Sequence, residues 1–384
     1  MDPFFLGGRR LAGVRLENVL KKFDDVVALK NIDLEIRDHE FLVLLGPSGC
    51  GKTTILKLIA GTEKPDEGNV YFNEENVSGV DPMKRNVAMV FQNFGLYPHL
   101  NVYKNMAFPL ETKKMKKDEI RKIVEDTAAK LDITHILNRK PRQLSGGQKQ
   151  RTALGRAMVR DPQVFLFDEP LSNLDPKMRL EIRDLIADLH KSLNTTFVYV
   201  THDQGEAMQL ADRIVVMEEG VIRQIGTPSE IYNHPNCVYV ASFVGAPQIN
   251  FYASRLYDRD GQPFVTIMGT DFAIPKKRLE ESYYRNANGN RIIAAIRPED
   301  FRLMPEREDL SGSYVEAAVS KFVPMGAGIH VEAMIRDICF TAVLPNHTEV
   351  TVGQTMKLFV DPECIHLFDP DTKESVTCSM DAPN

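Results

Sequence analysis

The sequence has no apolar run that approaches the roughly 20 residues needed for a membrane-spanning helix. Apolar stretches such as Phe41–Leu45 and Val164–Phe167 have the length of buried strands. Neither sign of charge dominates, since 47 Lys and Arg stand against 53 Asp and Glu, a formal net charge of −6. We therefore predict a chain that does not cross a bilayer by itself and has no general affinity for nucleic acid.

Cysteine is scarce, and its spacing matches no metal-binding pattern. The five cysteines are odd in number and widely scattered, which predicts reduced thiols, no disulfide and no zinc site. They are Cys50, Cys237, Cys339, Cys364 and Cys378. Residues 1–10 have an acid at position 2 and lack the basic start and longer apolar core of a secretory signal, so we expect a cytosolic location. Residues 1–13 have three glycines and are expected to form an N-terminal tail.

The chain has 384 residues, which at about 150 residues per domain predicts two or three domains. Hydrophobic residues make up 43% of the chain and charged residues 26%, the mixture of a globular protein. Over 14–235, short β-branched and aromatic runs alternate with helical segments, which predicts an α/β domain with a parallel core sheet. Residues 113–130 and 148–160 are rich in helix formers, which predicts an inserted helical subdomain at about 93–160. The clearest buried strands are Phe41–Leu45, Val164–Phe167 and Phe197–Val200.

The pattern changes after Pro235. Short alternating runs such as Arg291–Ile296, Gly328–Ala333 and Met356–Val360 are separated by Gly, Pro and Asn. We therefore expect 236–384 to form a separate, mainly β domain, built as a small barrel or a pair of barrels.

A glycine-rich loop follows the first buried strand. It reads G-x-x-x-x-G-K-T, between a strand and a helix that ends near Gly61, which is the setting of a phosphate-binding loop. Its backbone N–H groups and the positive end of the helix would face the phosphates of a nucleotide, Lys52 would bridge the β- and γ-phosphates, and Thr53 would place its hydroxyl on Mg²⁺. The predicted nucleotide-binding residues of this loop are Gly46, Pro47, Ser48, Gly49, Cys50, Gly51, Lys52, Thr53 and Thr54.

Two adjacent acids end the buried strand at Val164–Phe167. Buried carboxylates at a strand end need a cation or a proton to stabilise them. We expect Asp168 to hold Mg²⁺ and Glu169 to polarise the water that attacks the nucleotide.

A third element, Leu-Ser-Gly-Gly-Gln, opens a helix between these two motifs. Ser145 is placed to cap the helix, whose N-terminus would bind another anion. With a phosphate loop before it and a strand-end Asp-Glu after it, this element resembles the signature of ATP-binding-cassette (ABC) ATPases, and the order of motifs matches that family over about 14–235. The resemblance implies ATP and Mg²⁺ as cofactors, and assigns nucleotide contacts to Ser145, Gly146, Gly147 and Gln148.

Four further residues occupy the family's functional positions. Gln92 matches the Q-loop glutamine, which senses Mg²⁺, and His202 matches the switch histidine that contacts the γ-phosphate. The resemblance thus implies a catalytic set of Glu169, His202, Gln92 and Lys52, and a metal set of Thr53, Gln92 and Asp168. Asp175 matches the D-loop, and Phe23 takes the place of the aromatic that stacks on adenine, where many members have Tyr or Trp.

The signature also implies a homodimer, because in the family it caps the ATP bound to the opposite cassette. Short segments at 244–251, 296–299 and 366–369 resemble landmarks of the oligonucleotide-fold-like regulatory domain in importer ATPases of the maltose and glycerol-3-phosphate type. The resemblance implies an ATPase at the cytoplasmic face of the inner membrane, peripheral to it. It would act with two transmembrane permease subunits and a periplasmic solute-binding protein to import a sugar, polyol or related carbohydrate.

Other functions stay open on the sequence. The solute could be a polyamine, a metal or another small molecule. A soluble ABC ATPase of DNA repair or translation would use the same motifs, but the long coiled coil, zinc cluster, second cassette and basic linker of such proteins are absent from the sequence. The C-terminal domain could also bind a regulator, although no stripe of aromatics interleaved with Lys and Arg is visible in it.

Overall fold

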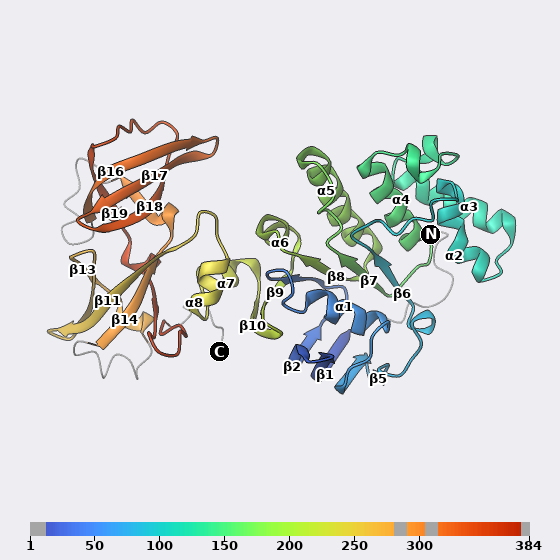
Figure 1. Ribbon diagram of the computed structural model, residues 1–384, viewed down its shortest axis with the longest axis horizontal. Helices are drawn as coiled ribbons and strands as arrows, with labels where there is room; N and C mark the ends of the chain where they lie inside the picture. Colours follow the sequence, from blue (N-terminus) through green and yellow to red (C-terminus); the bar gives the residue numbers. More distant parts are fainter. Residues whose placement is uncertain (1–12, 280–289, 304–313, 378–384) are drawn as a thin grey trace. The chain divides into compact units, whose positions relative to one another are not determined.

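The computed structural model describes residues 13–279, 290–303 and 314–377, in two compact units (Figure 1). The first unit ends at Pro228 and the second begins at Ser229. The predicted N-terminal tail, apart from Gly13, lies outside the described residues, as does Cys378. Among the residues that are described, no helix is both long and apolar enough to span a membrane.

A six-stranded sheet forms the centre of the first unit. Its order is β10-β9-β3-β8-β7-β6, and all neighbours are parallel except the β9–β10 hairpin. The three strands predicted from the sequence are confirmed as β3, β7 and β8. The strands are β3 (Phe41–Leu45), β6 (Val87–Val90), β7 (Val164–Asp168), β8 (Thr196–Thr201), β9 (Arg213–Glu218) and β10 (Val221–Gly226).

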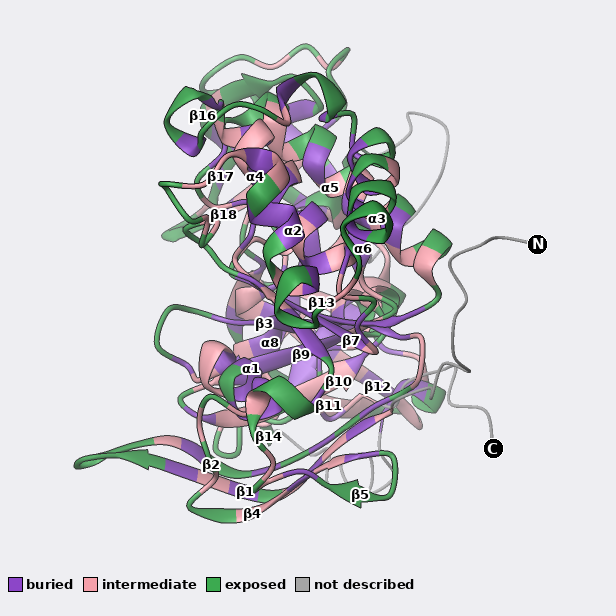
Figure 2. Cartoon of the chain, turned by 90° about the vertical axis from the view of Figure 1, so that its right-hand side faces the viewer, coloured by how far each residue is buried: buried purple, intermediate pink, exposed green. Residues whose placement is uncertain are grey.

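Both faces of this sheet are buried, which explains why its central strands read as unbroken apolar runs. Figure 2 shows β3, β7 and β9 as almost wholly buried. On one face, Leu42, Leu44 and their neighbours join a core with helix α1 (Lys52–Ala60). On the other face, Phe41, Phe197 and His190 form edge and tilted ring contacts at 5.0 to 5.5 Å.

An antiparallel sheet contributes the rest of the α1 core. Its order is β2-β1-β4-β5, and Val14, Leu16 and Val19 of β1 are buried in this core, with a register shift between Leu16 and Val19 that turns Val19 to the same face. The strands are β1 (Val14–Phe23), β2 (Val26–Ile36), β4 (Glu67–Phe72) and β5 (Glu75–Asn76).

The inserted helical subdomain lies between β6 and β7 in the chain. It contains α2 (Val102–Thr112), α3 (Lys117–Lys130) and α4 (Gly146–Met158), which pack on one another (Figure 1). Its buried core includes Met106, Val124 and Leu154, all fully or almost fully buried. The predicted helix at 113–130 begins at Lys117, because Lys114 has a left-handed backbone with φ of 57° that separates α2 from α3. Helices α5 (Pro176–Leu193) and α6 (Gln204–Leu210) complete the unit.

The second unit is a mainly β fold with a large hydrophobic core between two antiparallel sheets, which confirms the predicted all-β region. The first sheet has the order β13-β12-β11-β14-β20 and the second β15-β19-β16-β17-β18. The strands of the first are β11 (Asn250–Arg259), β12 (Gln262–Ile267), β13 (Thr270–Ala273), β14 (Asn290–Ile296) and β20 (His366–Phe368). Those of the second are β15 (Phe301–Leu303), β16 (Tyr314–Met325), β17 (Gly328–Ile335), β18 (Ile338–Leu344) and β19 (Thr355–Val360).

Two short helices precede these sheets, α7 (Pro228–Asn233) and α8 (Val238–Phe243). Arg297, which follows β14, is buried and donates to the carbonyl oxygens of Tyr232 and Val244, at the ends of the two helices. These bonds attach the helical segment to the sheets, so the compact unit begins at Ser229, before the boundary at Pro235 that the sequence predicts.

Candidate functional site

The glycine-rich loop follows β3 and wraps around the side chain of Lys52. The Lys52 Nζ atom donates to the carbonyl oxygens of Gly46 and Pro47, both at 2.8 Å. Only 4% of Lys52 is exposed, so this ammonium group is held inside the loop by the loop's own backbone. Ser48 and Gly49 are exposed at the loop's outer surface, and the loop thus presents its backbone outward around a buried positive charge.

Two glycines give the loop its curvature. Gly49 and Gly51 have φ of 83° and 106°, a left-handed backbone that residues with a side chain rarely adopt. A β-carbon on Gly51 would lie 2.8 Å from the carbonyl oxygen of Ala28 in β2, so a larger residue would not fit. Between them, Cys50 is buried with its Sγ 3.8 Å from Lys52 Nζ, and burial raises the pKa of its thiol.

A hydroxyl and a carboxylate meet beside this loop. Thr53, in the first turn of α1 next to Thr54, donates its hydroxyl to Asp168 Oδ1 at 2.8 Å. Burial raises the pKa of Asp168, while the Thr53 hydrogen bond opposes that shift. These are hard oxygen donors of the kind that Mg²⁺ prefers, and Mg²⁺ sites usually combine one or two carboxylates with substrate phosphates and water. The donor set therefore fits Mg²⁺.

Glu169 is the centre of a polar cluster at the same sheet edge. Its Oε2 accepts a hydrogen bond from Gln92 Nε2 at 3.3 Å and lies 3.3 Å from His202 Nδ1. Glu169 has a left-handed backbone with φ of 44°, uncommon for a residue with a side chain, and its N–H donates to Val200 O in β8. The Glu169 side chain is 19% exposed and the His202 side chain 54%. The structure thus brings together three predicted residues that follow three different strands.

The Leu-Ser-Gly-Gly-Gln segment forms the start of α4 with its own capping bonds. Ser145 Oγ accepts from the Gln148 N–H at 3.3 Å, and Gln148 Oε1 accepts from the Ser145 N–H at 3.2 Å. This reciprocal pair is a capping box. Gln148 therefore has a structural role in the helix start, which its S-x-x-Q spacing could have indicated.

The signature glycines pack closely on the segment that follows Glu169. A β-carbon on Gly146 would lie 3.1 Å from Leu174 Cδ2, and the Gly147 N–H lies 3.3 Å from Met178 Sδ. Asp175 caps α5 by accepting from the Met178 N–H at 3.0 Å, and Pro176 occupies the first helical position, where it needs no donor. The signature and the Asp175 segment therefore form one packed surface. None of the described contacts joins the signature to the phosphate loop.

Phe23 ends β1 at the β1–β2 hairpin. The residue is 38% exposed, and Lys21 Nζ lies 5.1 Å from its ring centroid. Lys21 is itself held by Asp66 at 3.3 Å. Phe23 is therefore an accessible aromatic ring on a fixed strand end, as stacking on a nucleobase would require.

A buried carboxylate behind His202 was not predicted from the sequence. Glu206 is 6% exposed and accepts from the hydroxyls of Tyr199 at 3.0 Å and Thr201 at 2.7 Å. Burial raises the pKa of Glu206, and burial together with this carboxylate raises the pKa of Tyr199. The D-x-x-E spacing from Asp203 instead favours a capping box at the surface, which is why sequence reasoning missed it.

Arg85 is a second buried group without a sequence signal. It is 2% exposed and donates to the carbonyl oxygens of Leu58 and Ile59, at the end of the helix that begins with the phosphate loop. Burial lowers the pKa of its guanidinium. A cation at a helix C-terminus satisfies unpaired carbonyls and the negative end of the helix dipole, so Arg85 stabilises α1.

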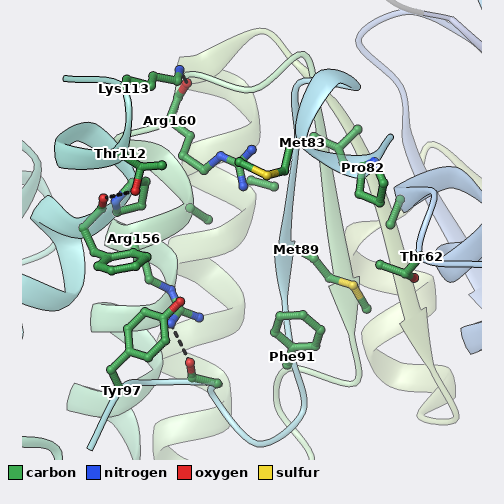
Figure 3. Close-up of a pocket in the computed structure, with 17 residues that line it drawn as sticks. Thr62, Pro82, Met83, Met89, Phe91, Tyr97, Thr112, Lys113, Arg156 and Arg160 are labelled. Carbon is green, nitrogen blue, oxygen red and sulfur yellow. Dashed lines mark hydrogen bonds between the residues drawn. The ribbon is translucent and has the colours of Figure 1, made fainter. Parts of the chain in front are cut away.

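A groove of about 440 Å³ lies between the helical subdomain and β6 (Figure 3). Its lining includes four exposed apolar side chains, and Arg156, Arg160 and Lys113 lie along one side. Arg156 donates to the Gly95 carbonyl oxygen and lies over the Tyr97 ring at 5.5 Å. None of the described residues that line the groove is Asp or Glu. The apolar side chains are Met83, Phe91, Tyr97 and Phe108.

Two protein families and several known proteins match this chain. Residues 29–172 match the ABC transporter family and residues 294–368 match the TOBE domain. The chain is 42% identical to the trehalose/maltose import ATP-binding protein MalK of Thermococcus litoralis, over 95% of this chain and all of the relative. It is 43% identical to the sulfoquinovosyl glycerol transport ATP-binding protein SmoE of Agrobacterium fabrum, with the same coverage. The sn-glycerol-3-phosphate import ATP-binding protein UgpC of Yersinia pseudotuberculosis is 41% identical, over 94% of this chain and 98% of the relative.

Solved structures show the same cassette. The structure of cbiO1 from Clostridium perfringens, part of an ABC transporter complex, matches 58% of this chain and 91% of its own, with a TM-score of 0.54 and 31% identity. A dimeric post-hydrolysis structure of the cassette MJ0796 with ADP and Pi matches 56% of this chain and 98% of its own, with a TM-score of 0.51 and 34% identity. The chain therefore belongs to the ABC transporter family, as an ABC-type ATPase that joins an ATP-binding cassette to a TOBE domain.

Proposed function

We propose that this chain is the ATP-hydrolysing subunit of an ABC importer for a sugar, polyol or related carbohydrate. The observation that carries the proposal is that Gln92 and His202 both contact Glu169 beside the phosphate loop. Related import subunits for trehalose/maltose, sulfoquinovosyl glycerol and glycerol-3-phosphate support the class of solute.

The phosphate loop would bind ATP through its backbone and Lys52. The Lys52 ammonium would exchange the carbonyl oxygens of Gly46 and Pro47 for phosphate oxygens, a short movement for a flexible side chain. Phe23 would stack on the adenine. Thr53 and Asp168 would hold Mg²⁺ with Gln92 nearby, and the bound ion would neutralise charge on the phosphates.

Glu169 would act as the general base for the attacking water. Its carboxylate is oriented by Gln92 and His202, both 3.3 Å from the same oxygen. A carboxylate held between an amide donor and an imidazole is fixed in direction, which a proton transfer requires. His202 would stabilise the charge that develops on the transferred phosphate.

The chain would act as a homodimer of cassettes. The signature packs on the Asp175 segment and carries a helix N-terminus, which favours an anion. Ser145, Gly146 and Gly147 would therefore reach the phosphates bound by a second copy. The relative with ADP and Pi is a dimer, which supports this arrangement.

In the homodimer, the groove beside β6 of each copy would receive a short helix from one of the two permease subunits. Phe91 directly precedes Gln92, so a helix in the groove would contact the residue next to the catalytic cluster. The apolar lining fits the apolar face of a helix, and the three cations fit a negative group on it. This contact would hold the chain at the cytoplasmic face of the membrane, where a periplasmic binding protein would deliver the solute to the permease.

We place the cassette at 14–235 and a regulatory β domain at 236–384. The compact units divide nearby, at Pro228, which supports two separately folding parts. A chain that ends at residue 240 would retain ATP hydrolysis. If such a chain is folded by circular dichroism but inactive, the division of roles is wrong.

The proposal is tested with the full chain and its permease pair in proteoliposomes. Uptake of a radiolabelled sugar or polyol should require ATP inside and the binding protein outside. Phe91→Glu, which places a negative charge in the groove, should abolish uptake and leave ATP hydrolysis by the isolated chain within about twofold. ATP hydrolysis without uptake of any carbohydrate, together with uptake of a polyamine or metal ion, would contradict the class of solute.

A further inference from the structure

The buried carboxylate of Glu206 fixes the two residues on either side of His202. Glu206 Oε2 accepts the hydroxyl of Thr201, the residue before His202, at 2.7 Å. Thr201 Oγ1 accepts the N–H of Asp203, the residue after His202, at 2.9 Å. Asp203 Oδ1 in turn accepts the Glu206 N–H at 3.1 Å. The histidine loop is therefore closed by a ring of hydrogen bonds through Glu206.

The ring is anchored in the sheet. Tyr199, which is fully buried in β8, donates its hydroxyl to the same Glu206 oxygen at 3.0 Å. Two hydroxyl donors on one buried oxygen compensate for part of the cost of removing a carboxylate from water. Because that cost is offset only in this arrangement, the carboxylate holds the loop in one position.

Arg179 connects the histidine loop to the Asp175 segment. Arg179 Nη1 lies 3.7 Å from Asp203 Oδ2, and its Nη2 donates to the carbonyl oxygen of Leu174 at 3.4 Å. The Arg179 N–H donates to the Asp175 carbonyl oxygen at 2.9 Å. One guanidinium therefore contacts both the loop that carries His202 and the segment on which the signature packs.

We propose that Glu206 and Arg179 are positioning residues for His202. Glu206 sets the distance from His202 to Glu169, and Arg179 makes that distance depend on the position of the Asp175 segment. The inference rests on the proposed function, in which that segment faces a second cassette. Closure of the dimer would then place His202 for catalysis without any contact between His202 and the signature.

The first test measures kcat and KM for ATP with the purified full chain. Glu206→Ala should lower kcat roughly 10- to 100-fold, the cost of a misplaced catalytic group, and leave KM within about twofold. Glu206→Gln should recover most of the turnover, because its amide oxygen can still accept both hydroxyls. Tyr199→Phe removes one donor and should give a smaller loss, which keeps the test valid if Glu206→Ala does not fold.

The second test repeats the substitutions in a His202→Ala background. Residues that act through His202 should have almost no further effect there, within about twofold, whereas general damage to the fold would lower kcat in both backgrounds. Arg179→Ala should behave like Glu206→Ala. The control is Arg183→Ala, one turn along α5, since Arg183 pairs with Asp184 at 3.0 Å and should leave kcat unchanged.

The outcomes separate the two proposals. A wild-type chain that does not hydrolyse ATP overturns the proposed function. An active wild type with unchanged kcat in Glu206→Ala and Arg179→Ala overturns the positioning role. Equal losses with and without His202 also overturn it, because the two residues would then act on the fold and not on His202.

Discussion

Two helix starts in the cassette are both suited to bind phosphate, yet they differ in what surrounds them. The start of α1 encloses a buried ammonium, a hydroxyl paired with Asp168 and, at the same sheet edge, the Glu169 cluster. Among the described residues, the start of α4 has its own capping box and contacts with the segment after Glu169. The α1 edge of the cassette therefore carries the groups that ATP hydrolysis needs. The α4 edge offers a helix N-terminus that suits an anion, without those groups.

This difference fits the proposed homodimer, in which each chain supplies one copy of each element. In the proposed dimer each ATP would lie between the α1 edge of one copy and the α4 edge of the other. Substitutions at the α1 edge should therefore abolish chemistry or ATP binding in each subunit, and substitutions at the α4 edge should impair only the closed pair.

The largest effect is expected at Glu169. Glu169→Gln keeps the size of the side chain but removes its basicity, so turnover should fall roughly 10²- to 10⁴-fold, the usual contribution of a general base. ATP binding should persist, and a dimer should accumulate with ATP in size-exclusion chromatography. Turnover equal to that of the wild type would remove Glu169 as the base.

Lys52→Ala should mainly weaken ATP binding. A charged hydrogen bond contributes about 1.5–3 kcal/mol, so the Kd for ATP should rise roughly 10- to 100-fold by isothermal titration calorimetry. The carbonyl oxygens of Gly46 and Pro47 also lose their donor. Lys64→Ala, at an exposed position after α1, serves as a matched lysine control, and unchanged binding by Lys52→Ala would contradict the phosphate-loop assignment.

At the α4 edge, Ser145→Ala should leave ATP binding to the separate chain intact. Turnover should fall about tenfold, because one hydroxyl contact with the phosphate of the second copy is lost. In a Glu169→Gln background the ATP-dependent dimer should weaken in analytical ultracentrifugation. Weaker ATP binding to the monomer would show that both edges contact the ATP bound by one chain. This result would contradict the division of roles between the α1 and α4 edges.

The smallest effect is expected for Gln148→Ala. It breaks the capping box but keeps the Ser145 hydroxyl, so stability should fall by about 0.5–1 kcal/mol in urea denaturation. Turnover should stay near that of the wild type. A loss as large as that of Ser145→Ala would mean that Gln148 contacts the nucleotide, as the sequence resemblance implies.

The parallel sheet could be predicted because burial on both faces leaves unbroken apolar runs such as Phe41–Leu45. The order of the motifs likewise predicts which residues meet at the sheet edge. The start of α3 was less predictable, because Lys114 adopts a left-handed backbone that its residue type does not favour.

The roles of Glu206 and Arg85 could not be predicted from local patterns. Their partners are Tyr199 and Thr201 in one case and the Leu58 and Ile59 carbonyl oxygens in the other. Charged residues are rarely buried unless they are paired, so sequence reasoning places both at the surface. Only the tertiary fold brings the compensating groups to them.

The exposed ring of Phe23 also determines how the protein can be observed. The sequence has no tryptophan, so ultraviolet emission from the wild type comes from its 11 tyrosines. Phe23→Trp would place a single indole at the end of β1, where the present residue is 38% exposed. Its fluorescence should be quenched when adenine stacks on it, which would give an optical titration of nucleotide binding free of any other indole signal.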